Sequence, residues 1–153
     1  MIAVEKDLKA ILRLQKIAFR DVAVMHNHLD MQPMVQTYEQ IKYDYDRGMI
    51  FLRILDCDDI IGSVRGCSDE GHICRIGKLV VHPDHQRNGF AKRLMNEIEE
   101  IFKECDEYRI FTSVRSTHVI SLYESLGYKE FSWESVADYS IVHMKKINHL
   151  NGA

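Results

Sequence analysis

The spacing of apolar side chains predicts two helices in the first third of the chain. Apolar residues recur every three or four positions over residues 5–19, which is the period of a helix with one buried face. Thr37 and Gln40 have the spacing of a capping box, in which each side chain bonds a backbone N–H at the start of a helix. We therefore expect a second helix from Tyr38 to about Arg47, where Gly48 ends it.

The middle of the chain predicts an antiparallel meander. Three apolar runs are separated by short polar turns, and turns of this length join neighbouring antiparallel strands. The expected strands are Met49–Leu55, Ile60–Cys67 and His72–Val81.

The clearest predicted element is a helix over residues 89–104. Its apolar residues form one stripe, and Glu99 and Glu100 belong to the opposite face, which we expect to be solvated. A strand, Arg109–Val114, follows, and a helix that crosses between two strands makes them a parallel pair. A short helix that ends at Gly127 comes next. The last expected strands are Tyr128–Trp133 and Tyr139–Lys145.

This order of elements predicts a mixed α/β sheet with helices on its faces. A chain of 153 residues is long enough for one compact domain, which we expect over residues 1–148, with a frayed tail over residues 149–153. The parallel pair should lie in the middle of the sheet. The crevice beyond the carboxyl ends of its strands is the expected ligand site.

Composition and charge narrow the class of protein. A net charge of -3 gives no support for non-specific nucleic-acid binding, which needs a positive surface. No apolar run approaches the roughly 20 residues of a membrane span, and the N-terminus lacks the pattern of a secretion signal. Cys57, Cys67, Cys74 and Cys105 show no CxxC spacing, so we expect reduced thiols in a cytoplasmic protein, with disulfides or zinc as the alternative.

The stretch from Lys78 to Met95 carries the strongest functional signal. An apolar strand runs through a proline-containing turn and Gly89 into the start of the amphipathic helix. The first backbone N–H groups of a helix have no intrahelical partner and lie at the positive end of the helix dipole. Such a helix start binds anions, phosphates above all, so we expect a phosphate-bearing ligand here.

This stretch resembles the acetyl-CoA signature of the GNAT (Gcn5-related) N-acetyltransferase family. The family pattern Gln/Arg-x-x-Gly-x-Gly/Ala reads Gln86-x-x-Gly89-x-Ala91 here, between a strand and a helix. A second block, Ser121–Tyr128, resembles the family's Leu-Tyr-x-x-x-Gly-Phe/Tyr stretch. The resemblance covers about residues 3–146. It implies an α/β (α+β) fold with a mixed, mostly antiparallel central sheet of six to seven strands flanked by about four helices.

The resemblance also implies an acetyl-CoA-dependent N-acetyltransferase that moves the acetyl group directly to a primary amine. A noncatalytic module that binds or senses acyl-CoA with the same fold is the alternative. Tyr123 would be the general acid that protonates the leaving thiolate, and the backbone N–H of Val81 would bind the thioester carbonyl. The positions implied to bind acetyl-CoA are Leu79, Val80, Val81, Gln86, Arg87, Asn88, Gly89, Phe90, Ala91, Lys92, Ser116 and Tyr123.

The chain departs from the family pattern in three places. Many members carry a glutamate base on the strand before the signature, near the place where Arg75 stands, so Glu39, His72 and Glu134 are all open as the base. Ser116 replaces the family's asparagine and would either bond the cofactor arm or cap the next helix. Only four residues precede the first helix, so the first strand of the family's fold is expected to be short or absent.

The sequence leaves the acceptor amine open. Residues 20–40 and the hairpin 128–140 would shape the acceptor pocket. A small molecule, a peptide N-terminus, a protein lysine, an aminoglycoside and a polyamine are all open as the acceptor. Homodimers are common in the family, and the apolar strand 139–144 would suit such an interface. No metal is expected, because His82 and His85 have no third ligand at a suitable spacing. The residues expected to give the pocket a mildly acidic lining are His26, His28, Asp30, Glu39 and Asp138.

Overall fold

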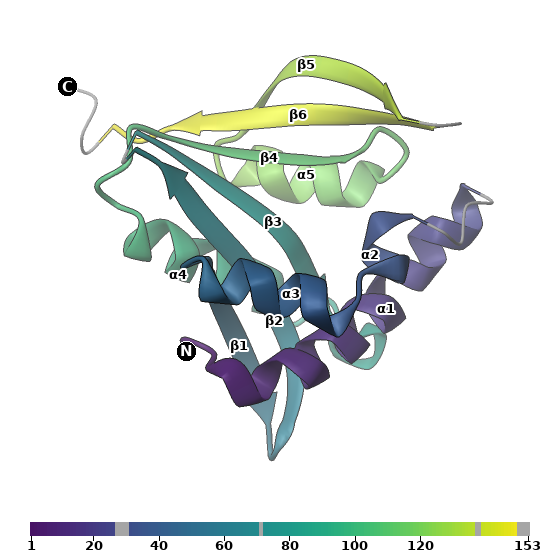
Figure 1. Cartoon of the computed structure of the whole chain (residues 1–153). Coiled ribbons are helices and arrows are strands. Elements are labelled where there is room, and N and C mark those ends of the chain that lie inside the picture. The colour runs from purple at the N-terminus through teal and green to yellow at the C-terminus, as the bar shows by residue number, and fades with distance from the viewer. Residues whose placement is uncertain (27–30, 71, 137–138, 150–153) are drawn as a thin grey trace.

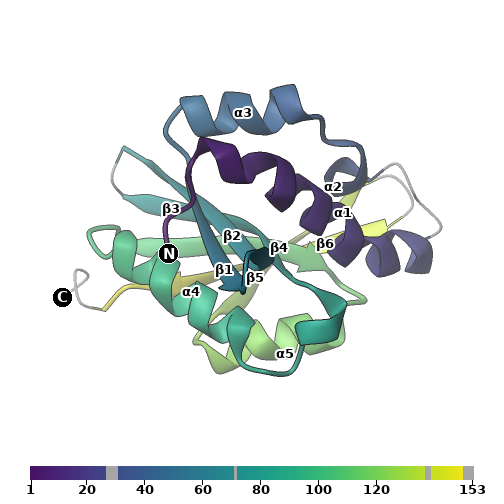
Figure 2. The ribbon, with the colours of Figure 1, turned by 90° about the horizontal axis from the view of Figure 1, so that it is seen from below.

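The computed structural model describes residues 1–26, 31–70, 72–136 and 139–149, which form one mixed sheet with helices on both faces (Figures 1 and 2). The helices are α1 (Leu8–Met25), α2 (Gln32–Val35), α3 (Tyr38–Asp46), α4 (Phe90–Ile101) and α5 (Thr117–Ser125), with 3-10 turns η1 (Glu5–Asp7) and η2 (Pro83–His85). The strands are β1 (Ile50–Asp56), β2 (Asp59–Asp69), β3 (Ile73–Val81), β4 (Glu107–Ser113), β5 (Lys129–Val136) and β6 (Tyr139–Ile147).

The sheet confirms the predicted fold class. Its strand order is β1-β2-β3-β4-β6-β5, and β3 and β4 are its parallel pair. All other neighbouring strands run antiparallel. Helices α1 and α3 cover one face of the sheet, and α4 and α5 cover the other (Figure 2). The N-terminal segment makes only an isolated bridge, Ile2 to Leu52, so the first strand of the expected fold is very short.

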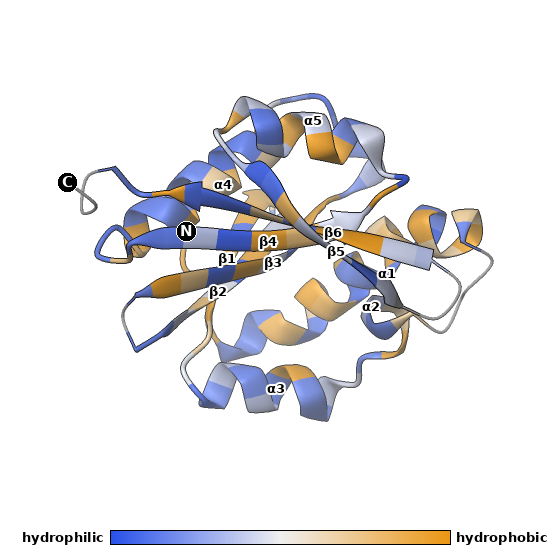
Figure 3. Cartoon of the chain, turned by 90° about the horizontal axis from the view of Figure 1, so that it is seen from above, coloured by the Kyte–Doolittle hydropathy of each residue, from blue (hydrophilic) through white to orange (hydrophobic). Residues whose placement is uncertain are grey.

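The helices differ from the prediction mainly at their ends. α1 continues to Met25, six residues beyond the predicted end, because Ala23 in its last turns is fully buried. The single turn α2 had no sequence signal apart from Pro33 in its first turn, a position where proline is favoured. Thr37 and Gln40 form the predicted capping box at the start of α3. Along the helices that bury one face, apolar and polar residues alternate within each turn (Figure 3).

α4 packs closely on β2, which fixes where its N-terminus lies. A Cβ on Gly62 would come within 3.2 Å of Leu94, and a Cβ on Gly66 would come within 3.2 Å of Ile98. Both distances are shorter than an ordinary contact, so the absence of a side chain at these two positions lets the helix approach the sheet. The main core lies in this layer, around Leu94, Met95 and Ile98.

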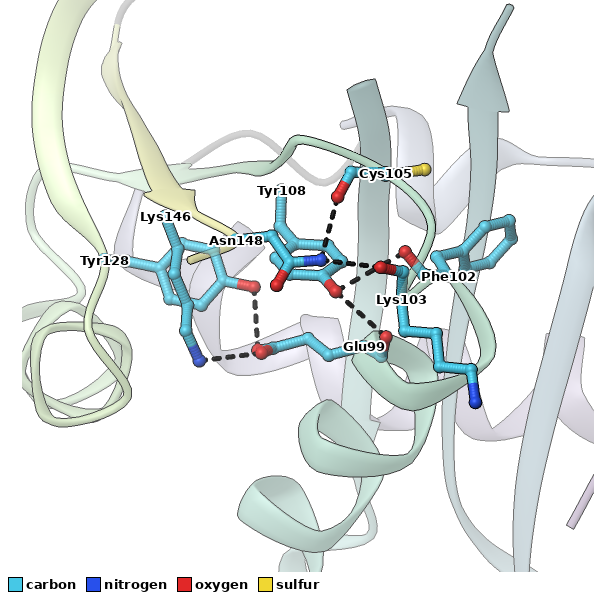
Figure 4. A network of polar contacts seen from close by, with 8 residues as sticks. All are labelled: Glu99, Phe102, Lys103, Cys105, Tyr108, Tyr128, Lys146 and Asn148. Carbon is cyan, nitrogen blue, oxygen red and sulfur yellow. Dashed lines mark hydrogen bonds and ion pairs between the residues drawn. The ribbon is translucent and has the colours of Figure 1, made fainter. Parts of the chain in front are cut away.

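Glu99 is not on a solvated face, which corrects the expectation from sequence. Its side chain is 12% exposed. Its carboxylate accepts hydrogen bonds from Lys146 Nζ at 2.7 Å and Tyr128 Oη at 3.0 Å (Figure 4). Asn148 donates to the carbonyl groups of Lys103 and Cys105, each at 2.8 Å. These bonds tie the end of α4 to β6 and to the start of β5.

Candidate functional site

The two parallel strands separate at their carboxyl ends. Pairing between β3 and β4 covers only Ile73–Arg75 opposite Glu107–Arg109, after which the strands diverge (Figure 1). β3 also carries a bulge, because its register against β2 shifts by one residue between Ser63 and Arg65. Lys78 lies in this bulge with φ of +52°, in the left-handed region. The middle of the sheet is therefore open where the strands end.

A cleft of about 530 Å³ occupies this opening. Its walls come from both layers of helices, because α1 and α2 lie on one side of the sheet and α5 on the other. The residues that line it are Ala18, Phe19, Val22, Met31, Gln32, Pro33, Ile76, Gly77, Lys78, Leu79, Val80, Val81, Gln86, Phe111, Thr112, Ser113, Ser116, His118, Val119, Tyr123, Tyr139 and Ile141.

The backbone of Val81 faces this opening. His82 N–H donates to the carbonyl of Ile61 on β2 at 2.8 Å. Bonded positions alternate along an antiparallel ladder, so the backbone groups of the preceding residue, Val81, point away from β2 and toward the gap. The Val81 carbonyl accepts a bond from Gln86 Nε2 at 3.2 Å. The Val81 N–H is thus placed to donate to a ligand that enters between the strands.

The loop before α4 builds an anion site. Arg87 and Gly89 have φ of +66° and +79°, and Asn88 Nδ2 bonds the carbonyl of His85 at 3.2 Å. No side chain caps α4 in the described part of the chain, and the first intrahelical bond runs from Arg93 N–H to Gly89 O. A Cβ on Gly89 would meet nothing within 4 Å, so an approaching phosphate could reach the helix start freely. The site therefore fits a diphosphate.

The remaining predicted cofactor residues lie around the start of α4 and the cleft. Phe90 and Ala91 form the first turn of α4 and are half-buried, whereas Arg87 and Lys92 are exposed. Ser116 is buried and lines the cleft, and its side chain does not cap α5. The structure therefore does not support the capping alternative for Ser116.

Tyr123 reaches the cleft from α5. It is 6% exposed and lines the cleft, and its hydroxyl makes no hydrogen bond to the described residues. Burial raises the pKa of the Tyr123 phenol, so the group stays protonated at neutral pH and can donate a proton.

None of the three general-base candidates from sequence lines the cleft. Glu39 is exposed on α3. His72 lies just before the opposite end of β3, with Nδ1 3.4 Å from Asp106. Glu134 lies on β5, with its carboxylate 3.3 Å from His143 Nε2.

The charge of the described lining comes from one basic side chain. His28, Asp30 and Asp138 fall outside the described residues. Among the described residues of the lining, Lys78 is the one lysine, arginine or carboxylate-bearing side chain. Burial, and then the nearby charge of Arg65, lower the pKa of Lys78 from 10.5 to about 8, although Asp44 opposes this. The described walls are otherwise mostly apolar.

Two features are absent from the described residues. They contain no group of three or more His, Cys, Asp or Glu side chains arranged to hold a metal ion. None of their helices has the length and apolar content that crossing a membrane would need. All four cysteines are free thiols.

Comparison with known proteins agrees with this geometry. The profile of the acetyltransferase (GNAT) family matches residues 9–128. The catalytic subunit of the N-terminal acetyltransferase B complex of Arabidopsis thaliana is 33% identical over 72 residues, covering 45% of this chain and 41% of that protein. This chain therefore aligns with about two fifths of the plant protein's length. An uncharacterized N-acetyltransferase of Pyropia yezoensis is 23% identical over 143 residues, covering 81% of this chain and 82% of that protein.

A solved structure shares the fold. It is the PaiA N-acetyltransferase of Thermoplasma acidophilum in complex with coenzyme A, with a TM-score of 0.78 at 16% identity. The match covers 95% of this chain and 95% of that chain.

Proposed function

Because the chain belongs to the acetyltransferase (GNAT) family, we propose that it transfers the acetyl group of acetyl-CoA directly to a primary amine. One observation carries the proposal. A single cleft lies at the parted ends of β3 and β4, is lined by the buried phenol of Tyr123, and reaches Gln86 in the loop that leads to the uncapped start of α4. These are the parts that a phosphate-bearing thioester needs: an anion site, a polar strand edge and a proton donor.

Each part has a role in the proposed reaction. The backbone N–H groups at the start of α4 hold the diphosphate, with Arg87 and Lys92 adding positive charge. The edge of β3 from Leu79 to Val81 binds the extended arm, and the Val81 N–H stabilises negative charge on the carbonyl oxygen. Bound acetyl-CoA supplies an activated acetyl thioester.

Tyr123 completes the reaction as the acid for the departing sulfur. Its phenol lines the cleft, and burial raises its pKa, so Tyr123 holds its proton at neutral pH and can donate it as negative charge develops on the departing sulfur. Its freedom from other described hydrogen bonds leaves the hydroxyl available to the ligand.

The acceptor carries an apolar group next to its amine. Phe19, Val22 and Met31 form much of the wall on the α1 and α2 side, where Pro33 adds to it. Lys78 lies in the described lining and would repel a polycation such as a polyamine or an aminoglycoside. A peptide with an apolar N-terminal residue or an arylalkylamine fits these walls better. The name of the plant relative, an N-terminal acetyltransferase subunit, favours the peptide.

Two measurements test the function. Isothermal titration should show acetyl-CoA binding, and a free-thiol assay with an amine panel should show thiol release with apolar-terminated peptides or arylalkylamines ahead of spermidine. The Tyr123→Phe variant should bind acetyl-CoA normally and lose about 10²–10⁴-fold in kcat, the usual contribution of general acid catalysis. Acetyl-CoA binding without thiol release on any amine would instead identify a sensing module.

A further inference from the structure

Ser113 and His26 form a short hydrogen bond at the wall of the cleft. His26 Nε2 lies 2.6 Å from Ser113 Oγ, although the two residues are 87 positions apart in the chain. Ser113 is the last residue of β4 and lines the cleft, and His26 directly follows α1. Both side chains are buried, at 6% and 8% exposure.

The hydrogen bonds of Ser113 leave one position open. A serine hydroxyl has one hydrogen to donate and two lone pairs that accept. The N–H of Arg115 donates to Ser113 Oγ at 3.2 Å and takes one lone pair. When Nε2 of His26 is unprotonated, the hydroxyl hydrogen points to it. The second lone pair then remains for a donor in the cleft, such as an ammonium group.

The surroundings of His26 suit a residue that receives a proton. Its backbone N–H bonds the carbonyl of Val22 at 3.1 Å, so it ends the 18-residue helix α1. The negative end of a helix dipole stabilises a protonated histidine. The Tyr139 ring of β6 stacks on the imidazole with 4.8 Å between centroids. Arg115 is a charged residue close to this helix end, with Nη1 3.4 Å from the Met25 carbonyl.

Ser113 and Tyr123 approach the cleft from opposite faces of the sheet. Side chains alternate between the two faces along a strand. Thr112 pairs with Val142, which belongs to the same core cluster as Tyr123, whereas Ser113 pairs with Ile141 and contacts His26 of the α1 layer. An amine that enters from the α1 side thus meets the serine, and the thiol that leaves on the α5 side meets the tyrosine.

We propose that Ser113 and His26 form the proton relay that deprotonates the acceptor amine, an inference that rests on the proposed acetyltransferase function. Ser113 Oγ accepts a proton from the ammonium while it passes its own hydrogen to His26 Nε2. The freed nitrogen lone pair forms the new C–N bond, the C–S bond breaks, and Tyr123 protonates the sulfur. The nitrogen loses its second proton to solvent as the amide forms, and one proton from solvent restores the Tyr123 phenol. Overall, ammonium and thioester give amide, thiol and one proton, which His26 releases to solvent. Ser113 is the catalytic residue of the pair, and His26 acts through it.

Two other arrangements compete with the relay. The neutral form of Lys78, which also lines the cleft, would serve as a base without Ser113. Alternatively, the serine–histidine pair would make Ser113 a nucleophile, with an acetyl ester on Oγ and free thiol as the products of a first step. The lysine base predicts that Lys78→Met, and not Ser113→Ala, changes the pH profile of the reaction. The covalent route predicts an added acetyl mass on Ser113. One set of measurements therefore separates both alternatives from the relay.

The test compares the unaltered chain with Ser113→Ala, Ser113→Thr and His26→Gln. For each, acetyl-CoA affinity, melting temperature and kcat are measured from pH 6 to 10. Without the relay, the reaction depends on amine that is already neutral, so the rate should rise steadily with pH. We expect Ser113→Ala and His26→Gln to lose about 10²–10⁴-fold in kcat at pH 7, with the defect shrinking toward pH 10. Ser113→Thr, which keeps a hydroxyl, should retain most of the activity.

Several outcomes would overturn the relay. A Ser113→Ala defect that is equal at every pH would indicate a structural role, and full activity in that variant would exclude the hydroxyl. Loss of the acidic limb of the pH profile in Lys78→Met, but not in Ser113→Ala, would assign the base to the lysine. Acetylated Ser113, found by intact mass without an acceptor, would establish the covalent route. If the unaltered chain binds acetyl-CoA but acetylates no amine, both the relay and the proposed function fail. The other outcomes overturn the relay and leave the proposed function intact.

Discussion

Replacing Gly89 with alanine separates ligand binding from folding at the start of α4. Gly89 has φ of +79°, and the Cβ of an alanine there would meet nothing within 4 Å. In the free protein the substitution therefore adds backbone strain without a steric clash. With a diphosphate bound against the helix start, the same Cβ occupies the space through which the phosphate reaches the N–H groups.

The size of both effects follows from these contacts. A left-handed alanine costs about 1–2 kcal/mol, and in a chain of this length each kcal/mol lowers Tm by about 2–4 °C. Loss of one hydrogen bond to a charged group costs about 1.5–3 kcal/mol. Since about 1.4 kcal/mol corresponds to a tenfold change, Kd for acetyl-CoA should rise about 10–100-fold.

Gly48 provides the matched control. It has φ of +98°, and an added Cβ would also meet nothing within 4 Å, but it lies between α3 and β1 and does not line the cleft. Gly48→Ala should lower Tm by a similar amount and leave acetyl-CoA affinity unchanged. The assay is isothermal titration beside thermal denaturation of both variants. Wild-type affinity in Gly89→Ala would refute the assignment of the diphosphate to this helix start.

Two stability predictions concern other charged groups. Burial holds the pKa of Lys78 at about 8 instead of 10.5, so between these values the unfolded chain binds more protons and stability rises with pH. Lys78→Met should therefore stabilise the chain by about 3 kcal/mol at pH 7. Urea titrations should show that this gain in unfolding free energy fades between pH 8 and 10.5. A gain that is independent of pH would contradict burial of the lysine charge as its cause. Glu99→Gln removes the negative charge that accepts hydrogen bonds from Lys146 and Tyr128. The substitution should lower the free energy of unfolding in urea by about 1–3 kcal/mol and leave acetyl-CoA binding unchanged. An unchanged urea midpoint would show that this network adds no stability.

The local structure of the candidate cofactor site could be predicted because its signals are local. The strand, the turn and the helix start lie within residues 78–95, and each has a residue pattern with a direct physical cause. Gly89 has the positive φ that a glycine permits, and no side chain caps the helix it precedes. The fold class was equally accessible, because the order of helices and strands constrains which strands can pair in parallel.

The proposed relay of Ser113 and His26 could not be predicted because it depends on a contact between distant segments. His26 and Ser113 meet across 87 positions, and α1 had to extend past its predicted end to bring the histidine there. The same reason explains the error at Glu99, whose partner Lys146 lies 47 positions away on β6. The apolar stripe of α4 identifies which side of the helix packs on the sheet. It does not show that a residue of another strand, Lys146, covers part of the polar side.

Lys78 and the proposed relay would act on the same step in different ways. A cation already in the cleft disfavours a second one, so an amine that binds beside Lys78 has a lowered pKa and loses its proton more easily. The relay then needs only to carry that proton away from the nitrogen. Both groups lie toward the α1 face, since Lys78 responds to the charges of Arg65 on β2 and Asp44 on α3, and Ser113 contacts His26. In the proposed reaction Tyr123, on the other face, would therefore keep its proton for the sulfur while the amine is deprotonated, because the acid and the base would lie on opposite sides of the reacting carbonyl.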